Sequence, residues 1–201
     1  TVNGSIPSGI AVGDAIENSD YYPSVTFRNN TVSNNKARGS LFTTPKQVIV
    51  EDNLFDYTSG SALLLAGDAA NWFESGASRN VIIRRNKLIN PLTAQYQFTN
   101  GIFSFCPSIS NVAGQKAFYH TNIRIEDNYI ETSDVPLFYA LSAANVEFKN
   151  NQIVYNNDCP SWKKKPFIFN KVSNITITGN TVTPSKTFSI DDVSLTNTDQ
   201  A

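Results

Sequence analysis

Two aspartates that follow apolar segments are the strongest candidates for catalysis in this sequence. The run from Ile10 to Asp14 aligns with the run from Leu64 to Asp68, and each ends in Gly-Asp. If the two runs are equivalent strands of a stacked repeat, with one strand between them, they lie roughly 9–10 Å apart. Carboxylates roughly 6.5–9.5 Å apart leave room for a water molecule, as in inverting glycosidases. Gly-Asp is also ordinary turn chemistry at a strand end, so a structural role for Asp14 and Asp68 stays open.

Five further residues are candidate contacts for a substrate. Glu17 and Glu74 occur on the same segments as the two aspartates, and Trp72 offers an apolar face to a sugar ring. Arg38 precedes an apolar strand and His120 ends a long segment, although each also has an ordinary structural interpretation. Because the chain has one histidine, a His-rich metal site is excluded. No nucleotide-binding loop and no Cys/His metal motif occurs either.

The composition indicates a turn-rich β-protein with no charged binding face. The 16 Lys and Arg residues nearly balance the 17 Asp and Glu residues, which gives a net charge of −1. This balance argues against binding to nucleic acid or to an anionic membrane surface. No apolar run approaches the roughly 20 residues of a membrane span, and the first residues show no signal-peptide pattern. Asparagine accounts for 24 residues, too many for a mainly helical chain because its side chain competes with the helix backbone.

Six segments share one pattern, apolar-x-apolar-x-x-Asn-x-apolar. They are residues 25–32, 48–55, 81–88, 123–130, 146–153 and 175–182. The aligned asparagines follow one another at 23, 33, 42, 23 and 29 residues. A fixed motif with variable spacing is typical of a solenoid whose coils, each one pass of the chain around the stack, carry loops of different length.

A second apolar run lies between successive copies, at residues 9–12, 39–42, 61–66, 101–105, 135–140 and 166–170. Strands that recur in this way stack in parallel at roughly 4.8 Å. The sequence therefore predicts an all-β fold, a right-handed parallel β-helix of about six to seven coils that fills residues 1–201 as a single domain. We expect the aligned asparagines to form a ladder and to occupy turns, because Asn tolerates left-handed backbone angles.

Three long connections identify the part of the stack that carries a site. Residues 13–24, 67–80 and 106–122 all follow a second apolar run, so they leave from the same corner and are expected to form one wall. Residues 90–100 and 155–166 decorate another corner, where Trp162 has the character of a solvated loop tip. Cys106 and Cys159 lie near loop edges and can pair only if two corners meet, which leaves their redox state open.

With these loops identified, the sequence resembles the β-helix of glycoside hydrolase family 110, the α-1,3-galactosidases. The resemblance spans about residues 9 to 153, and its most specific parts are NKARG at residues 35–39 and Gly67-Asp68 with WFESG at residues 72–76. It implies an inverting hydrolase without metal or cofactor that removes terminal α-1,3-linked galactose from a glycan. It also implies a secreted or periplasmic bacterial protein. Family members are much longer, so the chain resembles the C-terminal part of a longer β-helix.

Three functions remain open on the sequence alone. The first is the galactosidase, with Asp14 and Asp68 as catalytic residues and Glu17, Arg38, Trp72, Glu74 and His120 near the sugar. In this function the main catalytic acids can also lie in other coils of a longer chain. The second is a non-catalytic carbohydrate-binding or structural segment. The third is a polysaccharide lyase, which ranks last because the sequence shows no calcium-binding carboxylate cluster. The expected partner is an oligosaccharide or glycan, and the oligomeric state is left open.

Overall fold

The computed structural model describes residues 4–6, 8–10, 14, 16–69, 71–74, 76–94, 100–163 and 165–198 of the chain. These residues form sixteen strands, β1–β16, and two short 3-10 helices, η1 (Ser19–Tyr21) and η2 (Ile190–Asp192). The predicted all-β class is therefore confirmed. Within these residues, no helix has the length and apolar character needed to cross a membrane.

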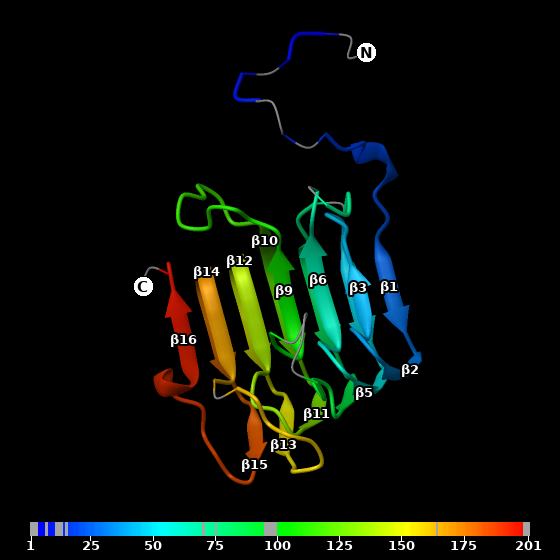
Figure 1. Ribbon diagram of the computed structural model, residues 1–201, viewed down its shortest axis with the longest axis vertical. Coiled ribbons are helices and arrows are strands. Elements are labelled where there is room, and N and C mark those ends of the chain that lie inside the picture. Colours follow the sequence, from blue (N-terminus) through cyan, green and yellow to red (C-terminus); the bar gives the residue numbers. More distant parts are fainter. Residues whose placement is uncertain are drawn as a thin grey trace.

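The strands form two parallel sheets, one of ten strands and one of six (Figure 1). The larger sheet divides into two sets of stacked strands, because the first half of β12 pairs with β9 and its second half pairs with β10, so there are three sets in all. The first set comes from the repeated pattern and comprises β1 (Val25–Arg28), β4 (Val48–Glu51), β7 (Arg79–Arg84), β10 (His120–Glu126) and the second halves of β12 (Phe138–Lys149) and β14 (Phe167–Thr178). The second set comprises β2 (Thr31–Asn35), β5 (Leu54–Thr58), β8 (Lys87–Ile89), β11 (Tyr129–Thr132), β13 (Gln152–Tyr155) and β15 (Thr181–Thr183). The third set comprises β3 (Ser40–Phe42), β6 (Leu63–Gly67), β9 (Phe103–Pro107), the first halves of β12 and β14, and β16 (Val193–Thr196).

Neighbouring strands pair in parallel, in the register that the repeated pattern predicts. The first apolar residues of the six copies lie opposite one another in order: Val25, Val48, Val81, Ile123, Val146 and Ile175. Alternate residues of these strands point into one continuous core, which the third set closes with phenylalanines such as Phe103 and Phe105. The period of two therefore identifies the buried face correctly.

The aligned asparagines form the predicted ladder along one corner of the stack. Their order is Asn30, Asn53, Asn86, Asn128, Asn151 and Asn180. At each step, both the backbone N–H and the side-chain amide of one asparagine donate to the Oδ1 of the next. The same amide also donates to a carbonyl of the preceding pass, as Asn86 does to Val50 at 2.9 Å. Each rung therefore satisfies buried polar groups of two passes.

The prediction that these asparagines adopt left-handed backbone angles is wrong by one position. Positive φ values occur at the residue before each rung, which is Asn29, Asp52, Arg85, Asp127, Asn150 or Gly179. The rungs themselves are asparagine because only an amide both accepts and donates in this geometry. The preceding position needs only a residue that tolerates the left-handed region, and its side chain varies accordingly.

A second, exposed ladder runs parallel to the first at another corner. It contains Asn80, Asn122, Asn145 and Asn174, the four asparagines that directly precede a copy of the pattern. These residues do have positive φ, between 51° and 57°. Here asparagine is used both for its backbone tolerance and for its amide.

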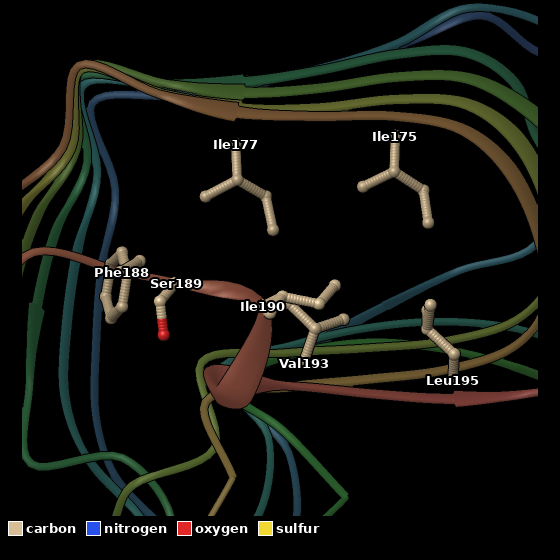
Figure 2. A pocket seen from close by; sticks show the side chains of 7 residues that line it. All are labelled: Ile175, Ile177, Phe188, Ser189, Ile190, Val193 and Leu195. Atoms are coloured by element: carbon tan, nitrogen blue, oxygen red, sulfur yellow. The ribbon is translucent and has the colours of Figure 1, made fainter. Parts of the chain in front are cut away.

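The core is partly covered at the end of the described chain (Figure 2). Residues that follow β15 cross this end, and Phe188 packs edge-on against Phe167 with ring centroids 5.0 Å apart. A cavity of about 340 Å³ remains between the last strands and η2, lined by Ile175, Ile177, Phe188, Ser189, Ile190, Val193 and Leu195. Figure 2 also shows the successive passes of the chain superimposed behind this cavity.

The first predicted strand comprises residues 9–12. Residues 11–13 lie outside the described residues, so only the first half of this strand can be compared with the prediction. Gly9 and Ile10 are described and belong to no strand, and Ile10 is 50% exposed. The first described strand of the stack is therefore β1.

Candidate functional site

A groove of about 650 Å³ lies on the outer face of strands β3, β6 and β9, where they meet the loops that follow β6 and β9. Figure 1 shows both loops rising from the same end of these strands. The groove is lined by Arg38, Leu41, Leu64, Ala66, Asp68, Trp72, Glu74, Cys106, Pro107, Ser108 and Ile109. Four of the seven predicted site residues are in this set: Arg38, Asp68, Trp72 and Glu74.

The floor of the groove is formed by the outward side chains of adjacent strands. Leu41 of β3 lies opposite Leu64 of β6, and Ala66 of β6 lies opposite Cys106 of β9. The neighbours Leu63 and Leu65 point the other way, into the core. Successive side chains of a strand point to opposite faces of the sheet, so the residues between the core positions face outward. On these three strands several of those outward residues are apolar, and they form the floor of the groove.

Asp68 organises the loop above this floor. Its Oδ1 accepts hydrogen bonds from the backbone N–H of Asn71 at 2.9 Å and from the Asn71 side-chain amide, which also donates to Oδ2. Its backbone carbonyl accepts from the N–H groups of Trp72 and Glu74. Asp68 therefore has the turn role that was left open, and the turn holds its carboxylate at the edge of the groove.

The turn at Asp68 presents two side chains with opposite chemistry. Trp72 is 76% exposed although it lines the groove, so most of its side chain is accessible to a ligand. Glu74 is half-buried. Among the described residues, no group donates a hydrogen bond to its carboxylate. An acceptor and an aromatic ring at the rim of an apolar floor can contact a ligand that has both polar groups and an apolar face.

Glu17 joins the first predicted loop to the second, outside the groove lining. Its Oε1 accepts from the backbone N–H of Gly76 at 2.9 Å, and its Oε2 accepts from the Tyr22 hydroxyl at 2.5 Å. The prediction that the three long loops share one corner is confirmed by this contact and by the shared groove lining. Glu17 fixes the wall rather than lining the groove.

Asp14 is exposed and is not among the groove residues. Its predicted equivalence with Asp68 depends on residues 11–13, which lie outside the described residues. No strand precedes Asp14 among residues 4–10 that are described. The pairing of Asp14 with Asp68 therefore stays a prediction.

Arg38 lies in the turn between β2 and β3 and is half-buried. It lines the groove together with Leu41, on the side away from β9. The prediction that Arg38 reaches the wall of the site agrees with this position. It adds a positive charge to a lining that also contains the carboxylates of Asp68 and Glu74.

His120 lies inside the molecule, at the start of β10, and is 0% exposed. Its Nδ1 accepts the backbone N–H of Ser78 at 3.1 Å, and its ring packs edge-on against Phe105 and Tyr119. Burial, reinforced by the charge of Arg79, lowers the pKa of His120 to about 3. In this structure His120 is a neutral residue of the interior and lies outside the groove lining.

Tyr119 is a residue of this wall that the sequence did not single out. A Cβ added at Gly67 would overlap the Tyr119 hydroxyl, so the glycine before Asp68 makes room for this phenol. Burial raises the pKa of Tyr119, and the charges of Glu17 and Glu74 raise it further. The hydroxyl is thus close to the acidic side of the wall. The sequence feature that could have identified Tyr119 is its position next to His120, at the end of the third long loop.

Cys106 lines the groove and Cys159 lies at the other decorated corner, and neither forms a disulfide. Burial raises the pKa of the Cys106 thiol, so it is protonated at neutral pH. Among the described residues, no group of three or more His, Cys, Asp or Glu side chains is placed to hold a metal ion.

Most of this chain is similar in sequence to proteins named alpha-1,3-galactosidase. An Akkermansia muciniphila protein named alpha-1,3-galactosidase B is 52% identical over 198 residues, which are 98% of this chain and 25% of that protein. A Parabacteroides distasonis protein of the same name is 47% identical over 90% of this chain and 29% of its own length. A Bacteroides fragilis alpha-1,3-galactosidase A is 35% identical over 82% of this chain and 27% of its own length.

The chain thus spans about a quarter of the length of the curated relatives that it matches. No family model matches it. The similarity covers the repeated pattern, the groove strands and the wall loops together, because it extends over nearly the whole chain. By sequence, the chain is a homologue of one segment of the alpha-1,3-galactosidases.

Proposed function

We propose that this chain supplies the saccharide-binding groove of an enzyme that removes terminal α-1,3-linked galactose from glycans. The observation that carries the proposal is the groove itself, which brings Arg38, Asp68, Trp72 and Glu74 together over an apolar floor. The names of the relatives supply the reaction and the linkage. The substrate is therefore a galactose-terminated oligosaccharide or glycan.

Asp68 and Glu74 are the two carboxylates that line the groove. We assign to them the contacts with the hydroxyl groups, the water molecule and the glycosidic oxygen of the substrate. The Asn71 amide fixes the orientation of Asp68, which suits a group that holds sugar hydroxyls or a water molecule in a constant place. Glu74 accepts no hydrogen bond from the described residues, so its carboxyl group can turn toward a glycosidic oxygen. Inverting hydrolysis needs one carboxyl group to protonate that oxygen and another to activate water on the opposite face of the sugar.

The decisive test is release of galactose from an α-1,3-linked galactosyl oligosaccharide by the 201-residue chain, with and without EDTA. If Glu74 has the proposed role, Glu74→Gln lowers kcat/KM by roughly 100-fold or more. Glu147→Gln is the matched control, because Glu147 lies on β12 and pairs with Lys149 outside the groove. Equal activity of Glu74→Gln and the control would remove Glu74 from the mechanism. Loss of activity with EDTA would instead point to a metal-dependent reaction.

A second candidate function is that of a saccharide-binding segment without turnover. The observation in its favour is that the chain spans about a quarter of its relatives' length, so reacting groups can lie elsewhere in such proteins. A folded sample that binds the oligosaccharide but releases no galactose supports this function. It would also show that Asp68 and Glu74 bind sugar but do not complete the reaction.

We further propose that the stacked passes form a right-handed parallel β-helix. The register supports the parallel helix, because paired residues differ in number by the same steps as the ladder asparagines: Val25 pairs with Val48, as Asn30 bonds to Asn53. The right hand is the one expected for crossovers between parallel strands of one sheet. A crystal structure in which successive passes turn with the opposite hand would overturn this proposal. The secreted or periplasmic location suggested by the resemblance stays a prediction, and cell fractionation of the native host would test it.

A further inference from the structure

A second, smaller groove of about 300 Å³ lies on the outer face of β7, β10 and β12. These strands contribute no residue to the groove on β3, β6 and β9. We propose that the second groove binds an acidic saccharide through its carboxylate or sulfate group. Arg124 and the side-chain amide of Asn80 hold the anionic group, and the saccharide ring lies along Ile82 and the neighbouring amides. This site is independent of the proposed function and takes a different class of ligand.

The exposed asparagine ladder forms one side of this groove, and its hydrogen bonds all run in one direction. Each Nδ2 amide donates to the Oδ1 of the next residue at 2.8–3.0 Å, in the order Asn174, Asn145, Asn122, Asn80. Amides bonded head to tail polarise one another, so the last donor of the chain is strengthened. That donor is the Nδ2 amide of Asn80, which bonds to no other residue in the described part of the chain. It is therefore available to an acceptor oxygen of a ligand.

The row of amides continues past the last bond of the ladder. Gln47 directly precedes Val48 as Asn80 directly precedes Val81, and the two valines lie opposite each other. Gln47 is exposed and lines the groove. Within the residues that the structure describes, no hydrogen bond joins its side chain to Asn80. Two amides at this end of the row can therefore donate to the same ligand.

Arg124 supplies the positive charge of the groove. In the register of the sheet it lies between Ile82 on β7 and Glu147 on β12. The carboxylate of Glu147 is bound by Lys149 at 2.7 Å. Among the described residues, no carboxylate lies within ion-pair distance of Arg124. The charge of this guanidinium group is therefore not neutralised by the protein.

The guanidinium group and the Asn80 amide can bind one anionic group together. Asn122 lies opposite Asn80, because the residues on either side of them are paired, and Arg124 follows two positions along β10. From the strand spacing and the rise per residue, the Cα atoms of Asn80 and Arg124 are at most about 8 Å apart. A guanidinium group binds a carboxylate or sulfate through two parallel N–H groups, and the amide donates to a further oxygen. Glu147 lies on the opposite side of β10, so the anionic group binds on the β7 side.

The remaining lining favours a saccharide over a simple ion. Ile82 is half-buried and offers an apolar contact for a ring face. Asn122 and Asn145 each use one amide hydrogen and one acceptor position of Oδ1 in the ladder. Each therefore keeps a donor and an acceptor for hydroxyl groups. The volume of about 300 Å³ is at the lower end of the range for small-molecule sites.

The test compares methyl glucuronide and glucose 6-sulfate with methyl glucoside, which has the same ring without the anionic group. Binding to the 201-residue chain is followed by the side-chain amide signals of Asn80, Asn122 and Asn145 in 15N–1H spectra. We expect both acidic sugars to shift these signals saturably and to bind at least about tenfold more tightly than the glucoside. Their affinity should fall when NaCl is raised from about 50 mM to about 500 mM, because salt screens the charge of an exposed guanidinium group.

Two variants assign the contacts. Arg124→Gln should raise the Kd of the glucuronide about tenfold or more and leave that of the glucoside within about twofold. Asn80→Asp keeps an acceptor for Asn122 but places a negative charge in the site, so it should weaken the glucuronide more than the glucoside. Arg28→Gln is the matched control, because Arg28 is an exposed arginine on β1 outside the groove. It should keep the glucuronide Kd within about twofold.

Three results would overturn the proposal. The first is equal affinity for the glucuronide and the glucoside, which would show that the anionic group is not recognised. The second is an equal effect of Arg124→Gln and Arg28→Gln, which would exclude a specific contact with Arg124. The third is binding of acetate as tight as that of the glucuronide, which would show that the sugar ring makes no contact. Galactose release depends on the other groove, so the test of the proposed function is unaffected by each of these results.

Discussion

Replacement of one buried rung of the asparagine ladder, Asn86→Ala, should destabilise the chain strongly. Asn86 is 2% exposed, and its side chain makes four hydrogen bonds. Its Oδ1 accepts from the backbone N–H and the amide of Asn53, and its amide donates to the carbonyl of Val50 and to Oδ1 of Asn128. Alanine removes all four bonds at a position that is shielded from solvent.

The groups left behind are not equally affected. Oδ1 of Asn128 keeps the backbone N–H of Asn86 as a donor, and the amide of Asn53 keeps its bond to the carbonyl of Phe27. The backbone N–H of Asn53 loses its acceptor, and an orphaned buried donor costs about 1–3 kcal/mol. With about 0.5–1.5 kcal/mol for each of the three further lost bonds, we expect the free energy of unfolding to fall by about 2.5–7.5 kcal/mol.

The assay is equilibrium unfolding in urea, followed by far-UV circular dichroism. The matched control is Asn122→Gly in the exposed ladder, where water can replace the bonds to Asn80 and Asn145, and glycine tolerates the φ of 57°. We expect this control to cost less than about 1 kcal/mol. Equal losses for Asn86→Ala and Asn122→Gly would refute the argument that burial of the rungs gives the ladder its strength.

Two further predictions concern the wall behind the groove. Burial lowers the pKa of His120 from 6.5 to about 3, so the folded state binds fewer protons than the unfolded state between these values. This contribution to stability is fully present above pH 6.5 and is lost as the pH falls toward 3, by about 1.4 kcal/mol per pH unit. His120→Asn keeps an acceptor for the Ser78 N–H and should flatten the urea-midpoint profile over this range; an unchanged slope would contradict the assignment. Gly67→Ala should lower the free energy of unfolding by about 1–3 kcal/mol through overlap with the Tyr119 hydroxyl. Thermal unfolding of the double variant with Tyr119→Phe should recover part of this loss, and additive losses would show that the two positions are independent.

The stacked strands could be predicted because their sequence signal is repeated. Val25, Val48 and Val81 were aligned by pattern alone, and they are paired in the structure. The ladder followed from the same alignment. The left-handed position was misplaced because Asn29 and Asn30 are adjacent asparagines, and the pattern does not show which of them turns the chain. The left-handed backbone angle and the ladder hydrogen bonds are separate requirements. The residue before each rung meets the first, and the rung asparagine meets the second.

The site was predictable only where it depends on the stack. Asp68, Trp72 and Glu74 were identified because their loop leaves a strand of the repeat. Tyr119 was not, because its contact with Gly67 joins two loops whose conformations follow no period. His120 was expected near the sugar because it ends the third long loop, whereas its ring lies in the interior, where Phe105 and Ser78 contact it. Loop residues are placed by contacts that no local pattern encodes.

The ladder also separates the spacing of the stack from the length of the chain between rungs. Asn128 follows Asn86 by 42 residues and Asn151 follows Asn128 by 23, yet the amide-to-Oδ1 distance is 3.0 Å in both cases. The hydrogen bonds of the ladder fix the distance between neighbouring passes and do not depend on the number of residues in between. A loop at the groove corner can therefore lengthen without disturbing the strands below it. Such a chain can be altered one loop at a time, by evolution or by grafting, and new recognition surfaces can be exchanged on a frame whose register stays the same.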